Sequence, residues 1–192
     1  MLRAITFDFW GTLYQNASAQ EERLLLLGDV LARAGQPRSL PLLQAAYDHA
    51  WGLFQHLWLR EHRSITTPRW IEEMLTFLDA SLPLEARDGL IRPLEEVFLH
   101  SDAPRPVAGV SEVLPRLAQQ FSLGVISDVG LTPGRVLREL LRRDGLLPHF
   151  CAWAFSDETG LTKPLADPFL LTLEALGARP QEAVHIGDLP ET

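Results

Sequence analysis

Short apolar runs and longer helical stretches alternate along this chain. Four of the runs are rich in β-branched and aromatic residues and carry few polar ones, which is typical of strands buried inside a parallel sheet. Polar or turn-forming residues end each run. We therefore predict strands at residues 4–7, 121–126, 152–155 and 183–186.

Apolar residues at helical spacing occupy most of the remaining chain. Between the first two strands, residues 15–100 carry helical patterns without a strand signal. Beyond residue 110, helices and strands alternate, and residues 157–163 form a loop. The predicted helices cover residues 18–34, 41–60, 67–78, 84–99 (kinked or divided at Pro93), 110–120, 132–143 and 167–176.

This order of elements indicates an α/β fold. Strands that alternate with helices form βαβ units, and such units build a parallel sheet. The first strand pairs naturally with the strands of the second half, so residues 15–100 are an insertion. Residues 102–106, which include two prolines, form the linker that returns to the sheet.

Composition limits the kind of partner. The formal net charge of −8 argues against a nucleic-acid surface, which usually carries a basic patch. No apolar run reaches the length of a membrane span, and the N-terminus lacks the pattern of a signal peptide. The single cysteine, Cys151, rules out an intrachain disulfide and is interpreted as a small core residue. We expect a cytoplasmic protein that acts on a small molecule and binds neither nucleic acid nor membrane.

Polar residues stand where the predicted strands end. Asp8 follows the first strand, Ser127 and Asp128 follow the second, Asp188 follows the fourth, and Lys163 lies in the loop after the third. The carboxyl ends of parallel strands share one edge of the sheet, so these groups can converge there. Each alone has an ordinary explanation, such as an Asp that starts a turn. Their ordered combination indicates a catalytic site.

In these residues the chain resembles the haloacid dehalogenase (HAD)-like hydrolase superfamily, and the resemblance covers nearly the whole chain. Four motifs mark that family: Asp-x-Asp-x-Thr, a strand-end Ser or Thr, a Lys usually followed by Pro, and an acidic motif often written Gly-Asp. The resemblance implies a Rossmann-like parallel sheet core at residues 1–14 and 101–192, with an all-helical cap at residues 15–100. The motifs correspond here to Asp8, Trp10 and Thr12; Ser127; Lys163-Pro164; and Gly187-Asp188.

The resemblance also implies a metal-assisted reaction at the first motif. Asp8 would be the nucleophile and form a covalent aspartyl intermediate. Asp8, Asp188 and the main-chain carbonyl of Trp10 would hold Mg²⁺, a hard cation that prefers oxygen ligands. The metal would offset the repulsion between the attacking carboxylate and a phosphate dianion.

The remaining motif residues would serve the substrate. By the same resemblance, Ser127 and Lys163 would bind the transferring oxygens, and Lys163 would also oppose the two carboxylates as a catalytic residue. Thr12 would support the loop or contact the surroundings of the nucleophile. His185, inside the last strand, is interpreted as a core residue or one that supports the site from behind.

Two features depart from the family pattern. Trp10 replaces the aspartate that, in HAD phosphatases, protonates the leaving group and activates water. An indole N–H is only a donor and cannot act as a base near neutral pH. The chain also ends at Thr192, short of the acid and the further elements that the family usually carries. Either the chain is truncated at its C-terminus, which we favour, or it lacks a sheet edge and the outer acid. Glu191 is a candidate substitute for that acid, at a shorter spacing than the family pattern.

The sequence leaves three functions open. The first is a Mg²⁺-dependent phosphatase of small phosphorylated metabolites, favoured by Gly187-Asp188. The second is a metal-independent 2-haloacid dehalogenase, because members with that activity have an aromatic residue at the position of Trp10. Those members also use a cap arginine to bind the substrate carboxylate, and residues 41–60 offer no clear counterpart. The third is a degenerate member that binds a ligand or partner without efficient turnover.

The sequence of the inserted helices does not indicate which substrate the protein binds. Trp51, Phe54 and Trp58 form an aromatic stripe at helical spacing, which is interpreted mainly as packing and alternatively as pocket lining. The histidines of this region are interpreted as structural, because no acid or cysteine completes a metal set. The cap is also a candidate surface for a homodimer.

Overall fold

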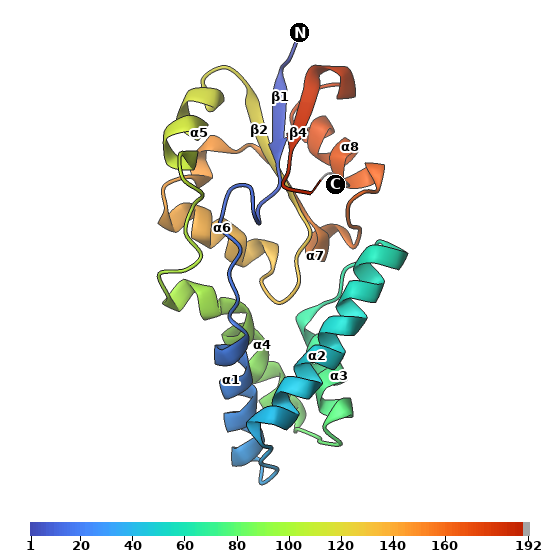
Figure 1. The fold of residues 1–192 in the computed structure, drawn as a ribbon. Helices are drawn as coiled ribbons and strands as arrows, with labels where there is room; N and C mark the ends of the chain where they lie inside the picture. Colours follow the sequence, from blue (N-terminus) through green and yellow to red (C-terminus); the bar gives the residue numbers. More distant parts are fainter. Residues whose placement is uncertain (190–192) are drawn as a thin grey trace.

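A parallel four-stranded sheet forms one half of the molecule (Figure 1). The computed structural model describes residues 1–189, so the prediction for Glu191 lies outside the described residues. The strand order is β3-β2-β1-β4, and β1 lies between β2 and β4 with Ala4 opposite Ser122 and Ala183. The α/β fold with a parallel sheet is therefore confirmed. The strands are β1 (Ala4–Phe7), β2 (Ser122–Ser127), β3 (Ala152–Phe155) and β4 (Ala183–Ile186).

Helices cover both faces of the sheet. On one face, leucines of α6 (Gly134–Arg143) share a core cluster with Ile5 and Phe7 of β1 and Leu114 of α5 (Val110–Ala118). On the other face, α8 (Ala166–Ala175) packs on β2 and β3. This double covering explains why the strands are continuous apolar runs rather than alternating ones.

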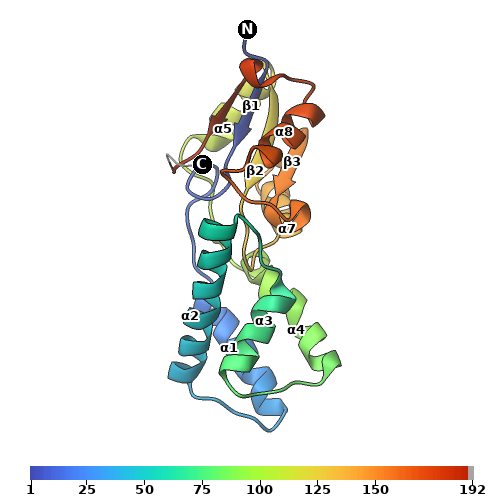
Figure 2. The ribbon, with the colours of Figure 1, turned by 90° about the vertical axis from the view of Figure 1, so that its right-hand side faces the viewer.

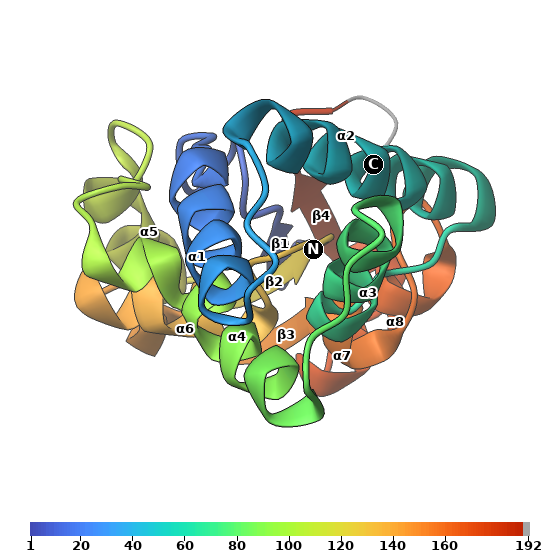
Figure 3. The same cartoon turned by 90° about the horizontal axis from the view of Figure 1, so that it is seen from below.

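A layer of helices lies beyond the carboxyl ends of the strands (Figures 2 and 3). We call residues 20–100 the helical layer. Most of its buried side chains belong to a second core cluster, which also includes Leu131, whereas Phe98 belongs to the sheet cluster. The boundaries at residues 15 and 100 stay a prediction. The layer contains α1 (Gln20–Arg33), α2 (Leu40–His56), a π-helical turn (Leu57–Glu61), α3 (Thr67–Phe77), α4 (Leu84–Glu96) and a 3₁₀ turn (Val97–His100).

The structure differs from the predicted elements in a few places. The helix predicted over residues 41–60 changes to a π-helical turn at Leu57, and the predicted loop at 157–163 begins with a short helix, α7 (Ser156–Thr159). Cys151 is exposed, so its interpretation as a core residue is wrong. It lies just before β3, where the backbone still pairs but the side chain points outward. No helix within residues 1–189 is both long and apolar enough to cross a membrane.

Candidate active site

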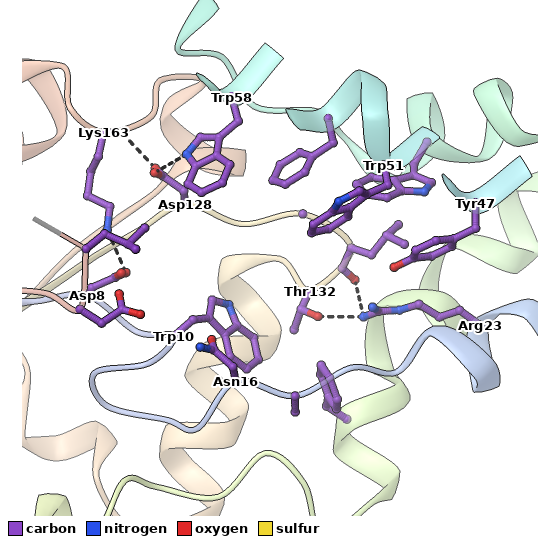
Figure 4. Close-up of a pocket in the computed structure, with 18 residues that line it drawn as sticks. Asp8, Trp10, Asn16, Arg23, Tyr47, Trp51, Trp58, Asp128, Thr132 and Lys163 are labelled. Carbon is purple, nitrogen blue, oxygen red and sulfur yellow. Dashed lines mark hydrogen bonds and ion pairs between the residues drawn. The ribbon is translucent and has the colours of Figure 1, made fainter. Parts of the chain in front are cut away.

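The predicted strand-end residues meet at the edge of the sheet that faces the helical layer. Asp8 directly follows β1, Asp128 follows β2, and Asp188 lies two residues beyond β4. Lys163 reaches the same place from the segment between α7 and α8. Figure 4 shows Asp8, Asp128 and Lys163 gathered at one end of a cavity.

Asp8 and Lys163 form a buried ion pair. Asp8 is 7% exposed and Lys163 is 3% exposed. Asp8 Oδ1 accepts a hydrogen bond from the backbone N–H of Phe9 at 2.7 Å and lies 3.0 Å from Lys163 Nζ. Both of these contacts are made by Oδ1 of the carboxylate. Burial raises the pKa of the Asp8 carboxyl, and the charge of Lys163 opposes that rise.

A second carboxylate lies close to the first. Gly11 has a φ of +73°, and a Cβ at this position would lie 2.6 Å from Asp188 Cγ. Only glycine combines this left-handed backbone with so close an approach. The negative charge of Asp188 also adds to the raised pKa of Asp8. Gly11 therefore lets the loop after β1 fold against Asp188 and keeps the two acids together.

The donor atoms of these two acids are of the kind that magnesium prefers. Two carboxylates and the nearby main-chain carbonyl of Trp10 are all oxygen donors, and Asp188 is exposed, which leaves room for water ligands. Within residues 1–189 no group of three His, Cys, Asp or Glu side chains is arranged around a common point. Mg²⁺ commonly needs only one or two carboxylates besides water and substrate phosphate.

Asp128 connects the sheet to the helical layer. Its Oδ2 accepts a hydrogen bond from Trp58 Nε1 at 2.9 Å, and its Oδ1 accepts one from the backbone N–H of Lys163 at 3.1 Å. Burial raises the pKa of Asp128, while the charge of Lys163 and the Trp58 hydrogen bond lower it. The sequence marked Asp128 as a strand-end acid but assigned it no role, because its partner Trp58 is 70 residues away.

The cavity has a volume of about 390 Å³ and lies between the sheet edge and the helical layer. Trp10 lines it and packs against Phe9 and Phe98 at ring-centroid distances of 5.0 and 5.9 Å. Thr12 and Ser127 lie near this edge, but neither is among the described residues that line the cavity. Their predicted contact with substrate stays a prediction.

The aromatic stripe of Trp51, Phe54 and Trp58 both packs in the helical layer and lines the cavity. Phe54 belongs to the helical-layer core and stacks on Trp58 with the ring planes 13° apart. Phe54, Trp58 and Trp51 also line the cavity, together with Tyr47 and Trp70. The packing interpretation is thus confirmed for Phe54, and the stripe also lines the cavity, while its role as the lining of a substrate pocket stays a prediction.

Arg23 is a charged cavity residue that sequence reasoning missed. It lies on α1, is 7% exposed, and donates hydrogen bonds from Nε to Leu94 O and from Nη2 to Leu131 O and Thr132 Oγ1. The sequence-based expectation for a cationic residue was limited to residues 41–60. A usable signal was its spacing: Arg23 precedes Leu27 and Leu31 by four and eight residues, which places it on the buried face of the helix.

The arrangement of a buried aspartate, a lysine and a second acid at the ends of parallel strands agrees with comparisons to known proteins. The family model for haloacid dehalogenase-like hydrolases matches residues 2–191. The chain belongs to this family. None of the curated proteins compared with this hydrolase matches it.

Solved structures similar to this hydrolase include proteins of different activities. A 2-haloacid dehalogenase from Pseudomonas syringae pv. Tomato DC3000 is 28% identical with a TM-score of 0.68, and the match covers 100% of this chain and 80% of that one. YfnB from Bacillus subtilis, assigned as a HAD hydrolase and bound to magnesium, is 20% identical with a TM-score of 0.61. That match also covers 100% of this chain and 80% of the other.

A predicted phosphoglycolate phosphatase from Haemophilus somnus 129PT is 17% identical with a TM-score of 0.61, and the match covers 97% of this chain and 77% of that one. The likenesses under 25% identity show the fold alone. The family identifies a hydrolase, and the names of these similar structures give different substrates.

Proposed function

We propose that this hydrolase is a Mg²⁺-dependent phosphatase of small phosphorylated metabolites. The observation that carries the proposal is the pair of carboxylates, Asp8 and Asp188, held together across Gly11. A catalyst that used Asp8 alone would gain nothing from a second negative charge beside its nucleophile. Two neighbouring carboxylates are useful when they hold a divalent cation together. That cation would reduce the repulsion between the carboxylates and a phosphate group.

The proposed reaction begins at Asp8. A carboxylate oxygen of Asp8 attacks phosphorus, and the bond from phosphorus to the ester oxygen breaks with its electron pair leaving on that oxygen. Lys163, 3.0 Å from Asp8 Oδ1, holds positive charge beside the transferring group. Water then attacks phosphorus of the aspartyl phosphate, which releases phosphate and restores Asp8.

Trp10 sets the range of leaving groups. Its indole N–H cannot protonate a departing alkoxide, because an indole is a donor that does not ionise near neutral pH. Phenols and other acidic alcohols leave as anions without that proton. We therefore propose aryl or similarly activated phosphate esters as the best substrates of the natural chain.

The test is hydrolysis of 4-nitrophenyl phosphate with Mg²⁺ and after removal of metal by EDTA. Activity is expected with Mg²⁺, with a loss of at least 100-fold after chelation, in Asp8→Asn and in Asp188→Asn. Asp29→Asn is the matched control, because Asp29 is an exposed acid on α1 that pairs with Arg33. Activity that survives chelation, or that survives Asp8→Asn, would sink the proposal.

A second candidate is a metal-independent 2-haloacid dehalogenase, and Trp10 is the observation that favours it. A halide leaves carbon as a stable anion, so Asp8 can displace it without a general acid, and water then hydrolyses the ester to a 2-hydroxy acid. The 28% identical dehalogenase structure also supports this candidate. Halide release from 2-chloropropionate in the presence of EDTA is the expected result, and its absence would contradict the candidate.

A further inference from the structure

The proposed reaction needs a base that the loop after β1 does not supply. In its second half, water attacks the aspartyl intermediate on Asp8, and that water must lose a proton. Trp10 stands two residues after Asp8, and its indole N–H accepts no proton near neutral pH. Fast hydrolysis of the intermediate therefore requires another residue of the cavity to take the proton.

The carboxylates that line the cavity are the candidates for this base. Among the described residues they are Asp8, Asp128 and Asp188, and no histidine of residues 1–189 lines the cavity. Asp8 carries the intermediate itself. Asp188 would hold the metal ion in the proposed reaction, and a carboxylate bound to a cation competes poorly for a proton. Of these three acids, Asp128 is the one that the reaction leaves unused.

Asp128 lies on the side of Asp8 from which water approaches. The register of the sheet places Phe7 of β1 opposite Val125 of β2, so Asp128 stands two positions further toward the helical layer than Asp8. Two positions correspond to about 6–7 Å of extended chain. Displacement at phosphorus is roughly in line, so the attacking water stands on the far side of the phosphoryl group from Asp8. The position of Asp128 suits a base for that water.

The hydrogen bonds of Asp128 orient its carboxylate and leave it able to accept a proton. Trp58 Nε1 donates to Oδ2 at 2.9 Å, and the backbone N–H of Lys163 donates to Oδ1 at 3.1 Å (Figure 4). A carboxylate has about four acceptor sites, so two of these bonds leave room for water. Lys163 Nζ also lies 3.0 Å from Asp8 Oδ1, so one residue holds both acids. Burial raises the pKa of Asp128, which makes its carboxylate a stronger base than an exposed one.

We propose that Asp128 is the general base of the second half-reaction. The attacking water gives a proton to the Asp128 carboxylate while its oxygen bonds to phosphorus. The bond from phosphorus to the Asp8 oxygen breaks, and its electron pair restores the Asp8 carboxylate. Asp128 then releases the proton to solvent. This role rests on the proposed function, because it needs the intermediate at Asp8, and it leaves the first half-reaction without a general acid.

Rapid-quench kinetics with 4-nitrophenyl phosphate and Mg²⁺ tests the proposal. Asp128→Asn keeps the size of the side chain and removes the base. The variant is expected to release one 4-nitrophenolate per active site at a rate within about threefold of the natural chain, and then to turn over at least about 100-fold more slowly. Mass spectrometry after acid quench is expected to find the phosphoryl group on Asp8. An unchanged kcat, or a first turnover slowed as much as the later ones, would overturn the proposal.

Two further variants separate proton transfer from support of the fold. Asp157→Asn is the matched control, because Asp157 is also a partly buried acid just beyond a strand and accepts a hydrogen bond from the backbone N–H of Gly134, yet is not among the described residues that line the cavity. Its kinetics are expected to equal those of the natural chain. Trp58→Phe removes a hydrogen bond to Asp128, as Asp128→Asn also does, but keeps the carboxylate. It is expected to hydrolyse the intermediate within about threefold of the natural rate, and accumulation equal to that in Asp128→Asn would overturn the proposal.

The same quench with 2-chloropropionate in EDTA separates this inference from the proposed function. If 4-nitrophenyl phosphate is not hydrolysed, but Asp128→Asn releases one chloride and keeps an ester on Asp8, the phosphatase fails and the base stands. If the natural chain hydrolyses the phosphate and Asp128→Asn retains no intermediate, the base fails and the phosphatase stands. If the natural chain forms an intermediate from neither substrate, both fail.

Discussion

At the scale of single residues, Trp10 decides which esters the hydrolase can cleave. It stands on the cavity wall beside Asp8, where its indole N–H cannot return a proton to an alkoxide. Trp10→Asp is expected to raise kcat/KM for butyl phosphate by at least 100-fold, the usual lower range for general acid catalysis. The value for 4-nitrophenyl phosphate is expected to change little, because nitrophenolate leaves unaided. Steady-state kinetics with both substrates measures the ratio.

Trp10→Phe is the control for this prediction. It keeps an aromatic ring against Phe9 and Phe98 and adds no acid. Its ratio between the two substrates is expected to equal that of the natural chain. If Trp10→Asp also leaves the ratio unchanged while remaining folded, the missing acid does not limit turnover on alkyl esters.

His185 makes the stability of the chain sensitive to acid. Burial and the charge of Lys163 lower the pKa of His185 to about 4. Its Nδ1 contacts Thr6 Oγ1 at 2.9 Å, and its buried Nε2 has no partner within residues 1–189, so a second proton would find no acceptor. The unfolded chain takes up that proton near pH 6.5, so stability is full above this pH and falls as the pH drops toward 4.

The measurement is the free energy of unfolding at pH 7 and pH 4.5 by urea denaturation. With allowance for partial exposure, His185 is expected to contribute about 1–2 kcal/mol to the loss between these values. His185→Gln is expected to lose less stability by that amount, and the exposed His49→Gln is expected to behave like the natural chain. Equal acid sensitivity in all three proteins would contradict the assignment.

The residues of the site divide into those that the sequence could place and those that it could not. Asp8 and Asp188 were predictable, because each stands at or just beyond the end of a parallel strand and topology alone brings such ends together. Lys163 was predictable from its Lys-Pro motif in the segment that follows the third strand. Arg23 was not, because its importance depends on how α1 packs against the loop after β2. Contacts between elements that are distant in the sequence cannot be predicted from the local sequence pattern.

At the scale of elements, close approach of α6 to β3 limits which residues fit between them. A Cβ on Gly134, the first residue of α6, would lie 2.7 Å from Phe155 Cβ. The Phe155 ring is fully buried and has no room to move. Gly134→Ala is therefore expected to lower the free energy of unfolding by about 2 kcal/mol, as overpacking does.

Gly52→Ala provides a control of opposite sign. Gly52 lies inside α2, is exposed, and would have nothing within 4 Å of an added Cβ. Alanine in a helix interior is expected to raise the free energy of unfolding by about 0.5–1 kcal/mol. Denaturant titration of both variants checks the pair, and a neutral Gly134→Ala would contradict the packing argument.

Elements with the strongest local signal were also the most predictable. The strands at 152–155 and 183–186 were predicted to the residue, because unbroken apolar runs between turn residues leave little freedom. The π-helical turn that starts at Leu57 was not predictable, since the residues of this turn are compatible with an ordinary helix. Its geometry is tied to a partner outside the helix, the Trp58 contact with Asp128.

At the scale of the whole molecule, polar contacts cross the junction between two apolar clusters. The sheet cluster and the helical-layer cluster are separate, and contacts between the two layers include Trp58 with Asp128, Arg23 with the backbone at Leu131, and Arg135 with Glu95. Polar contacts of this kind can break and re-form at low cost compared with an apolar core. The cavity lies at this junction, so its shape depends on them.

Trp58→Phe isolates one of these contacts. The phenyl ring retains an aromatic surface against Phe54 and removes the donor to Asp128. Loss of one hydrogen bond to a charged acceptor is expected to lower amide protection about tenfold in the segments 57–64 and 128–132. Hydrogen exchange read by mass spectrometry measures this, with β1 and β2 expected to stay unchanged. Trp51→Phe, which alters the same cavity wall away from Asp128, is expected to leave protection intact, so equal protection in both variants would show that this contact does not join the layers.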